Sequence, residues 1–267
     1  MSPEGTIAVS LRGVRKSFGN GVEALEGLDV TIRPKEFVSL LGPSGCGKST
    51  ALRIIAGLSE PTSGSVEWPL AQPTALEPAN DSAGSAIGIV FQEPTLMPWS
   101  TVARNVRLPL DLQGESVTRA DARVKTALEH VGLTLFADAY PRELSGGMKM
   151  RVAIARALVA EPKLLLMDEP FAALDEITRF KLNDDLLALW RMFGMTVVFV
   201  THSVFESVYL SSRIVVMTSR PGRVFTELEV DAPYPRDANF RTSAEYAALC
   251  RRASEALAAA AAIGGGQ

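Results

Sequence analysis

The stretch FVSLLGPSGCGKST, residues 37–50, decides the fold. Its first residues form a mainly apolar run, which is typical of a buried strand, and the residues from Lys48 onward follow a helical spacing. Between them, GPSGCGKST (42–50) fits the pattern G-x-x-x-x-G-K-[ST]. A glycine-rich loop in this position lets backbone N–H groups approach phosphate oxygens, and the start of the helix favours the negative charge. The stretch therefore predicts a phosphate-binding loop in an α/β fold.

Strands and helices alternate along the rest of the chain. We predict β-rich runs at 7–14, 28–32, 87–92, 163–170, 196–202, 213–219 and 223–230, and helices at 102–112, 119–133, 147–159 and 177–193. This alternation predicts a parallel sheet whose functional edge lies at the carboxyl ends of the strands. Residues 69–86 have the composition of a loop and are expected between two outer strands.

The composition fits a globular protein and excludes several other classes. The chain has 267 residues, is 47% hydrophobic and carries 30 acidic and 27 basic residues, so it lacks the basic excess typical of nucleic-acid binding. Neither a secretory leader nor a run of about 18 apolar residues occurs, which predicts no membrane span. The only cysteines, Cys46 and Cys250, are too few for a disulfide framework or a four-cysteine zinc site, and they indicate a reducing cytosol.

Four polar residues carry the chemistry expected at the sheet edge. Lys48 would reach the β- and γ-phosphates of a nucleotide, and the Ser49 hydroxyl would bind Mg²⁺. Asp168 and Glu169 follow an apolar run, where the first carboxylate would complete the Mg²⁺ shell and the second would polarise the attacking water. Taken alone, such an acidic pair is more often a helix cap or a turn. The phosphate loop upstream favours the catalytic interpretation.

His202 and Gln92 end two further predicted strands. Since both would emerge on the edge that holds Lys48 and Glu169, we predict that His202 contacts the γ-phosphate. The neutral amide of Gln92 suits a contact with Mg²⁺ or water. The other histidine, His130, is predicted to lie on a helix surface.

A second glycine turn, LSGGMKMR at 144–151, precedes another predicted helix. A helix N-cap and a glycine turn would account for Ser145 alone. The phosphates of one nucleotide are already enclosed by residues 42–50, so this helix start forms an anion site that points elsewhere. If two copies pair head to tail, each LSGG can close on the γ-phosphate held by the other copy. We therefore expect each complete site to need both chains.

Together the motifs resemble those of the ATP-binding subunit of ABC transporters, over about residues 7–230. The matching motifs in chain order are Phe18, GPSGCGKST (42–50), Gln92, LSGG (144–147), LLLMDEP (164–170), ALD (173–175) and His202. The resemblance implies a P-loop NTPase core, an antiparallel β subdomain, a helical subdomain over about 93–160, and a linker and helical tail over 231–267. Met148 stands where the family often has glutamine, and the 69–86 loop is longer than usual.

The resemblance also implies the cofactors, ATP and Mg²⁺, and the site residues. It implies nucleotide contacts for Phe18, which would stack on adenine, and for Gly42, Pro43, Ser44, Gly45, Cys46, Gly47, Lys48, Ser49, Thr50, Gln92, Ser145, Gly146, Gly147 and Asp175. It implies Mg²⁺ ligands at Ser49, Gln92 and Asp168, and catalytic roles for Glu169 and His202.

Longer stretches such as FQEPTLMPWSTVARNV and RIVVMTSRPGRV resemble the nitrate/sulfonate/taurine importer branch. This resemblance implies a second copy of the chain, transmembrane permease subunits, an indirectly contacted periplasmic binding protein and a peripheral place on the cytoplasmic face of the inner membrane. An importer of thiamine pyrimidine precursors and an exporter or lipid-trafficking complex remain alternatives. A DNA-repair ATPase is disfavoured because no long insertion or CxxC pair separates Lys48 from Ser145. A ribosome-acting ATPase is disfavoured because only one ATPase half is present.

Three local expectations complete the sequence analysis. Cys46 lies near a helix start and Lys48, both of which lower a thiol pKa, so we expect maleimide to label it unless ATP protects it. Leu96, Met97 and Trp99 are expected either to line a groove for a permease helix or to lie in a buried loop. The tail is expected either to cover the sheet edge or to touch the second copy.

Overall fold

The computed structural model describes residues 7–70 and 87–263, and within them two β-sheets form. The larger sheet has six strands in the order β5-β6-β7-β3-β8-β9, and the smaller has three in the order β2-β1-β4. The strands are β1 Val9–Ser17, β2 Glu23–Ile32, β3 Phe37–Leu41, β4 Ser63–Glu67, β5 Ile87–Val90, β6 Leu164–Asp168, β7 Thr196–Thr201, β8 Arg213–Met217 and β9 Val224–Glu229. Most of the predicted loop 69–86 lies outside the described residues.

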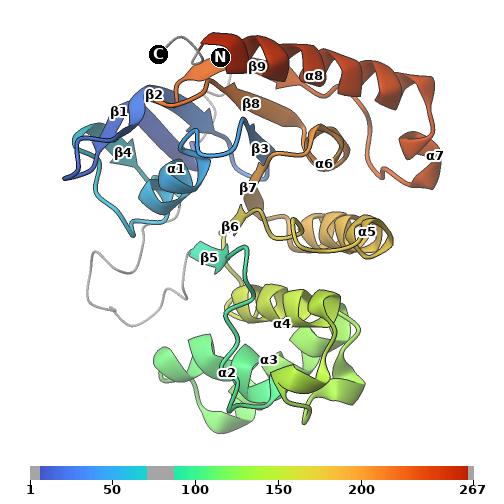
Figure 1. Ribbon diagram of the computed structural model, residues 1–267. Helices are drawn as coiled ribbons and strands as arrows, with labels where there is room; N and C mark the ends of the chain where they lie inside the picture. The colour runs from blue at the N-terminus through green and yellow to red at the C-terminus, as the bar shows by residue number, and fades with distance from the viewer. Residues whose placement is uncertain (1–6, 71–86, 264–267) are drawn as a thin grey trace, which may run out of the picture.

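The helices surround the larger sheet. They are α1 Lys48–Ile55, α2 Val102–Leu112, α3 Val117–His130, α4 Gly146–Leu158, α5 Glu176–Phe193, α6 Val204–Leu210, α7 Ala238–Arg241 and α8 Ala244–Ile263. Figure 1 shows α2, α3 and α4 grouped at one end of the molecule and α8 at the other. No helix in the described ranges has the length and apolar character needed to cross a membrane.

The larger sheet is parallel from β5 to β8, and only the edge strand β9 runs antiparallel. The smaller sheet is antiparallel throughout. The predicted fold class, a P-loop NTPase core with an antiparallel β part and a helical part, is confirmed. Because parallel strands end on the same edge, the loops after β3, β6 and β7 meet there.

The parallel strands separate two hydrophobic cores. Along β7, Val197 and Phe199 belong to the core shared with the helices, whereas Val198 and Val200 belong to the core shared with α1 and the smaller sheet. Successive side chains of a strand point to opposite faces, so a strand covered on both sides must be apolar at nearly every position. This is why these strands appear in the sequence as continuous apolar runs.

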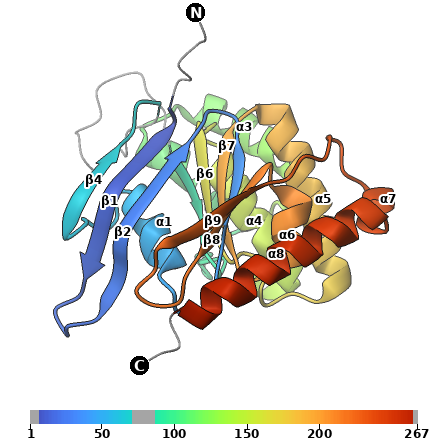
Figure 2. The same cartoon turned by 90° about the horizontal axis from the view of Figure 1, so that it is seen from above.

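The C-terminal tail packs onto the larger sheet. In Figure 2, α8 crosses β8, β9 and α6, and Tyr246 and Cys250 on α8 are buried there. The segment leading to α8 is held by Arg236, whose Nη1 donates to the carbonyls of Val208, Tyr209 and Ser211 and whose Nη2 donates to those of Val230 and Ala232. Of the two positions expected for the tail, cover over the sheet edge is therefore the one observed.

Candidate functional site

The loop after β3 has the backbone shape expected of a phosphate cradle. Gly47 precedes α1 with φ +106, a conformation that residues with a Cβ rarely adopt. A Cβ at Gly47 would also lie 2.6 Å from the carbonyl oxygen of Ala24. The position therefore excludes larger residues for two independent reasons, and the loop can turn directly into the positive end of α1.

Lys48, the first residue of α1, folds back over this loop. Its Nζ donates to the carbonyls of Gly42 at 2.8 Å and Pro43 at 2.9 Å, and it lies 3.7 Å from Glu169 Oε1. The residue is only 4% exposed. A buried ammonium group is thus held at the mouth of the loop, where it can meet an anionic ligand.

Ser49 and Asp168 bring two oxygen atoms together beside the loop. Ser49 Oγ donates to Asp168 Oδ1 at 2.8 Å. Burial raises the pKa of Asp168, and the hydrogen bond from Ser49 partly opposes that rise. Hydroxyl and carboxylate oxygens suit Mg²⁺, which keeps several waters and phosphate oxygens in its shell. No group of three or more acidic, histidine or cysteine side chains that could hold a metal occurs in residues 7–70 and 87–263. Ser49 and Asp168 are the residues here that could hold Mg²⁺ together with phosphate oxygens.

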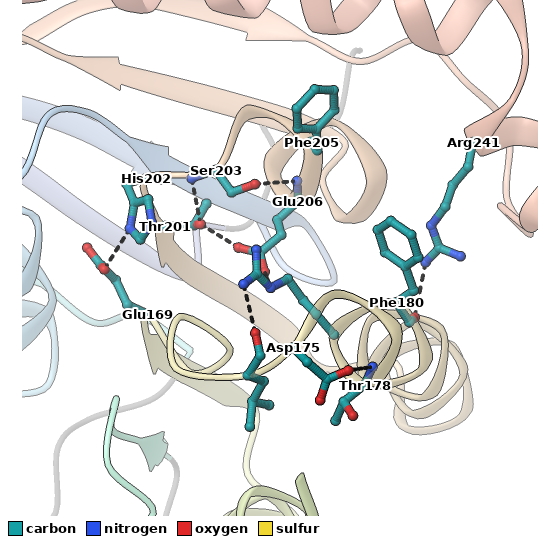
Figure 3. Close-up of polar contacts among 12 residues, drawn as sticks. Glu169, Asp175, Thr178, Phe180, Thr201, His202, Ser203, Phe205, Glu206 and Arg241 are labelled. Atoms are coloured by element: carbon teal, nitrogen blue, oxygen red, sulfur yellow. Dashed lines mark hydrogen bonds and ion pairs between the residues drawn. The ribbon is translucent and has the colours of Figure 1, made fainter. Parts of the chain in front are cut away.

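Glu169 and His202 face each other across the ends of β6 and β7 (Figure 3). Glu169 Oε2 lies 2.8 Å from His202 Nδ1, and the Glu169 N–H donates to the carbonyl of Val200 at 2.9 Å. Glu169 has φ +44, a strained backbone for a residue with a side chain. Strain of this kind persists only where the surroundings impose it, and it is common at functional sites. The carboxylate thus reaches both Lys48 and His202.

Ser145 caps α4, and the glycines after it allow a close approach to α5. Ser145 Oγ accepts the N–H of Met148 at 3.3 Å. A Cβ on Gly147 would lie 2.6 Å from Thr178 Cγ2, and one on Gly146 would lie 3.3 Å from Leu174 Cδ2. Packing within one chain thus accounts for Gly147, which the simple capping interpretation of this turn did not explain. Ser145 and Gly146 remain exposed and available to a ligand.

Asp175, Phe18 and Gln92 lie on loops at three separate places. Asp175 caps α5 by accepting the N–H of Thr178 at 3.0 Å, and this hydrogen bond lowers its pKa. Phe18 follows β1 and is 46% exposed, which leaves its ring free to stack. Gln92 is exposed beyond the end of β5 and, within the described part of the chain, makes no hydrogen bond to Ser49 or Asp168. Of the predicted Mg²⁺ ligands, Ser49 and Asp168 are thus in direct contact.

The expected reactivity of Cys46 is wrong. Its side chain is 1% exposed, and a Cβ on Gly42 would lie 2.8 Å from its sulfur. Burial raises the pKa of the thiol despite the nearby Lys48. The sulfur lies 4.0 Å from Lys48 Nζ, and Cys46 belongs to the core shared with α1 and the smaller sheet.

Sequence reasoning missed a second layer of polar residues behind His202. Thr201, Glu206 and Arg179 form a series of contacts that runs from β7 through α6 to the start of α5. Figure 3 shows Thr201 and Glu206 beside His202. The sequence offers one weak signal, since Glu206 and Arg179 each stand four residues after a motif residue, His202 and Asp175. Nothing in the sequence shows that these two side chains meet.

Comparison with known proteins decides the family. The family model described as "ABC transporter" matches residues 25–172. The chain belongs to the ABC transporter family. It is accordingly an ATP-binding subunit and an ATPase of that family.

Several relatives of this ABC ATPase match it over most of their length. An uncharacterized ABC transporter ATP-binding protein of Methanocaldococcus jannaschii is 49% identical over 228 residues, 85% of this chain and 82% of that protein. An aliphatic sulfonates import ATP-binding protein of Bacillus subtilis is 43% identical, covering 92% of each chain. A solved dimeric ATP-binding cassette with ADP and Pi is 35% identical with a TM-score of 0.72, covering 84% of this chain and 100% of that one.

Proposed function

We propose that this ABC ATPase energises the import of a small anion of the nitrate, sulfonate or taurine type through a separate permease. The carrying observation is the convergence of Lys48, Glu169 and His202 on one sheet edge, within contact distances of 3.7 Å and 2.8 Å. Support for import comes from relatives such as the sulfonate-import protein of Bacillus subtilis, at 43% identity. The chain would lie on the cytoplasmic face of the inner membrane.

In this proposal the nucleotide binds between two copies of the chain. Residues 42–50 of one copy enclose its phosphates, with Lys48 on the β- and γ-phosphates. Ser145–Gly147 of the other copy bring the start of α4 to the γ-phosphate. The dimeric cassette that holds ADP and Pi supports this arrangement, because it is 35% identical to this chain.

Hydrolysis would use the residues at the ends of β6 and β7. Glu169 accepts a hydrogen bond from the attacking water and removes its proton, and His202 contacts the γ-phosphate. Ser49 and Asp168 would hold Mg²⁺, which neutralises charge on the phosphates. The 2.8 Å contact between Glu169 and His202 supports this pairing of roles.

The loop 93–101 offers a docking place for the permease. Asn105 Nδ2 donates to the carbonyls of Met97, Ser100 and Thr101, and Asn105 Oδ1 accepts the Met97 N–H at 2.7 Å. Trp99 is nevertheless 75% exposed, whereas Leu96 is partly buried and packs against the core, so the expected buried position holds for Leu96 and not for Trp99. A large ring displayed on a rigid loop is the kind of anchor that carries much of the energy of a protein interface. We propose that it meets a short permease helix.

Uptake by intact cells tests the transported substrate. The chain and its permease are deleted together, and labelled taurine, an alkanesulfonate, nitrate and a thiamine pyrimidine precursor are offered in turn. We expect loss of uptake of one of the first three, restored by the wild-type pair and not by the pair carrying Glu169→Gln. Loss confined to the pyrimidine, or no loss of any uptake, would overturn the proposed substrate class while leaving the ATPase assignment intact.

A further inference from the structure

The residues on either side of His202 make hydrogen bonds that nucleotide contact does not explain. Its neighbour Thr201, 2% exposed, donates its hydroxyl hydrogen to Glu206 Oε2 at 2.6 Å and accepts the Ser203 N–H at 3.0 Å. Ser203 Oγ in turn accepts the N–H of Glu206 at 3.3 Å. The backbone on both sides of His202 is thus tied to Glu206 (Figure 3).

The other carboxylate oxygen of Glu206 faces the segment before α5. Glu206 Oε1 lies 3.7 Å from Arg179 Nε, and Arg179 Nη2 donates to the carbonyl of Leu174 at 2.9 Å. Leu174 immediately precedes Asp175, which lies on the exposed turn that starts α5. One continuous series of contacts therefore joins this turn to His202 (Figure 3).

The pair Arg179–Glu206 is close but not hydrogen-bonded. Arg179 Nε and Glu206 Oε1 are both buried, and neither has a hydrogen-bond partner in the described part of the chain. The Glu206 side chain is 8% exposed, and burial raises its pKa. Buried polar atoms without partners cost stability, and a buried ion pair often fails to recover the cost of desolvation. Stability alone is therefore a poor explanation for the pair.

We propose that Glu206 is a positioning residue for ATP hydrolysis. It holds the backbone around His202 in the geometry needed at the γ-phosphate, and it couples that geometry through Arg179 to the turn Leu174–Asp175. Arg179 Nε and Glu206 Oε1 lie 3.7 Å apart, so a small movement would bring them into a hydrogen bond. A shift of the turn Leu174–Asp175 would then be transmitted through this pair to His202. The inference rests on the role proposed above for His202.

The first test compares Glu206→Gln with a matched control in the full-length chain with Mg·ATP. We expect kcat to fall by roughly ten- to a hundredfold, the scale set by small misplacements of catalytic groups, while KM for ATP changes little. The control is Glu36→Gln, because Glu36 is 10% exposed and pairs with Arg213 at 2.7 Å. Glu36 immediately precedes β3, so it lies at the opposite end of that strand from the phosphate loop. The control should keep the wild-type kcat.

A second pair of variants covers the case in which Glu206→Gln fails to fold. Thr201→Val removes the hydroxyl at nearly constant shape, and Thr201→Ser retains it. If the contact with Glu206 positions His202, Thr201→Val should lower kcat and Thr201→Ser should keep it, with KM for ATP similar in both. Equal kcat values for the two variants would overturn the proposal.

A double variant separates this inference from the role of His202. Rates are followed with labelled ATP in single turnovers so that slow hydrolysis remains measurable. In the His202→Ala background, Glu206→Gln should have no further effect on the rate. A full additional loss, or a wild-type kcat for Glu206→Gln alone, would overturn the positioning role. A wild-type rate for His202→Ala would instead overturn the proposed role of His202, and the inference with it.

Discussion

At the scale of single residues, Glu169 has the most consequential surroundings. Its two oxygens lie 3.7 Å from Lys48 Nζ and 2.8 Å from His202 Nδ1, and its backbone takes φ +44. The residue is therefore fixed from three sides. The carboxylate of Glu169 would therefore present its oxygens to the attacking water in a nearly constant orientation.

Glu169→Gln should abolish turnover without abolishing ATP binding. The amide keeps the shape but cannot take a proton, so hydrolysis should fall by about two orders of magnitude or more. ATP should then hold two copies together, as size-exclusion chromatography with Mg·ATP would show. Glu161→Gln is the matched control, since Glu161 also has a positive φ, of 52, and its side chain is 70% exposed. A monomeric Glu169→Gln variant with wild-type hydrolysis would refute the assignment.

Both cysteines should resist alkylation in the folded chain. Cys46 is 1% exposed and Cys250 is 5% exposed, and burial raises the pKa of each thiol. We expect maleimide to label neither cysteine in the native chain, whether or not ATP is present. After denaturation it should label both cysteines, as intact-mass measurement would show. Rapid labelling of Cys46 in the native chain would contradict the buried position of its sulfur.

Sequence reasoning succeeded for residues whose role depends on position along a strand. Lys48, Asp168, Glu169 and His202 follow apolar strands that must end on one edge, so their meeting could be predicted. The burial of Cys46 was not predicted, because it depends on neighbours far along the chain: a Cβ at Gly222 would clash with the Cys46 carbonyl oxygen. The pair Arg179–Glu206 could not be predicted for the same reason, since two separate helices bring it together.

At the scale of elements, the close contact between α4 and α5 restricts which residues fit in the glycine turn LSGG (144–147). Gly147→Ala would push a methyl group to within 2.6 Å of Thr178 Cγ2, and overpacking of this kind costs about 1–3 kcal/mol of stability. Thr178→Ser removes that methyl group, so the double variant should recover stability in urea unfolding. Gly146→Ala, whose new Cβ would lie 3.3 Å from the end of a flexible leucine, should cost less. If the second substitution restores stability without restoring ATPase activity, Gly147 also acts at the nucleotide.

Trp99→Ala should separate folding from assembly. Because the ring is 75% exposed and the loop is held by Asn105, the isolated chain should change in stability by no more than about 0.5 kcal/mol. Copurification with the permease and uptake should both be lost. Leu135→Ala is the control, because Leu135 is 96% exposed elsewhere on the helical part. Unfolding of the isolated Trp99 variant, or uptake at the wild-type rate, would exclude the docking role.

The elements themselves differ in how well the sequence predicts them. The strands β3, β6, β7 and β8 of the larger sheet were predicted because burial on both faces leaves mainly apolar runs. The helix α6, Val204–Leu210, was missed because it is short and buried on most sides, which removes the amphipathic spacing. Its start is fixed by Ser203 and its end by Arg236, a residue that no local pattern connects to it.

At the scale of the whole molecule, Arg236 joins the tail to α6, the helix that follows His202. It is 5% exposed, and its guanidinium lies 4.2 Å from the ring of Tyr234. Arg236→Met should lower the free energy of unfolding by about 3 kcal/mol, since it leaves several buried carbonyls without donors. Chemical denaturation would measure the loss. Arg252→Met, at an exposed position on α8, should have almost no effect, and equal losses for the two variants would contradict this account.

The carbonyls bound by Arg236 affect when parts of the site can form during synthesis of the chain. Val208, Tyr209 and Ser211 close the helix that begins directly after His202 and Ser203, yet their donor is made only when residue 236 is added. The phosphate loop cannot form much earlier, because β3, which leads into it, lies between β7 and β8 in the sheet. A growing chain on the ribosome is therefore expected to complete both sides of the nucleotide site only when nearly all of the chain has emerged.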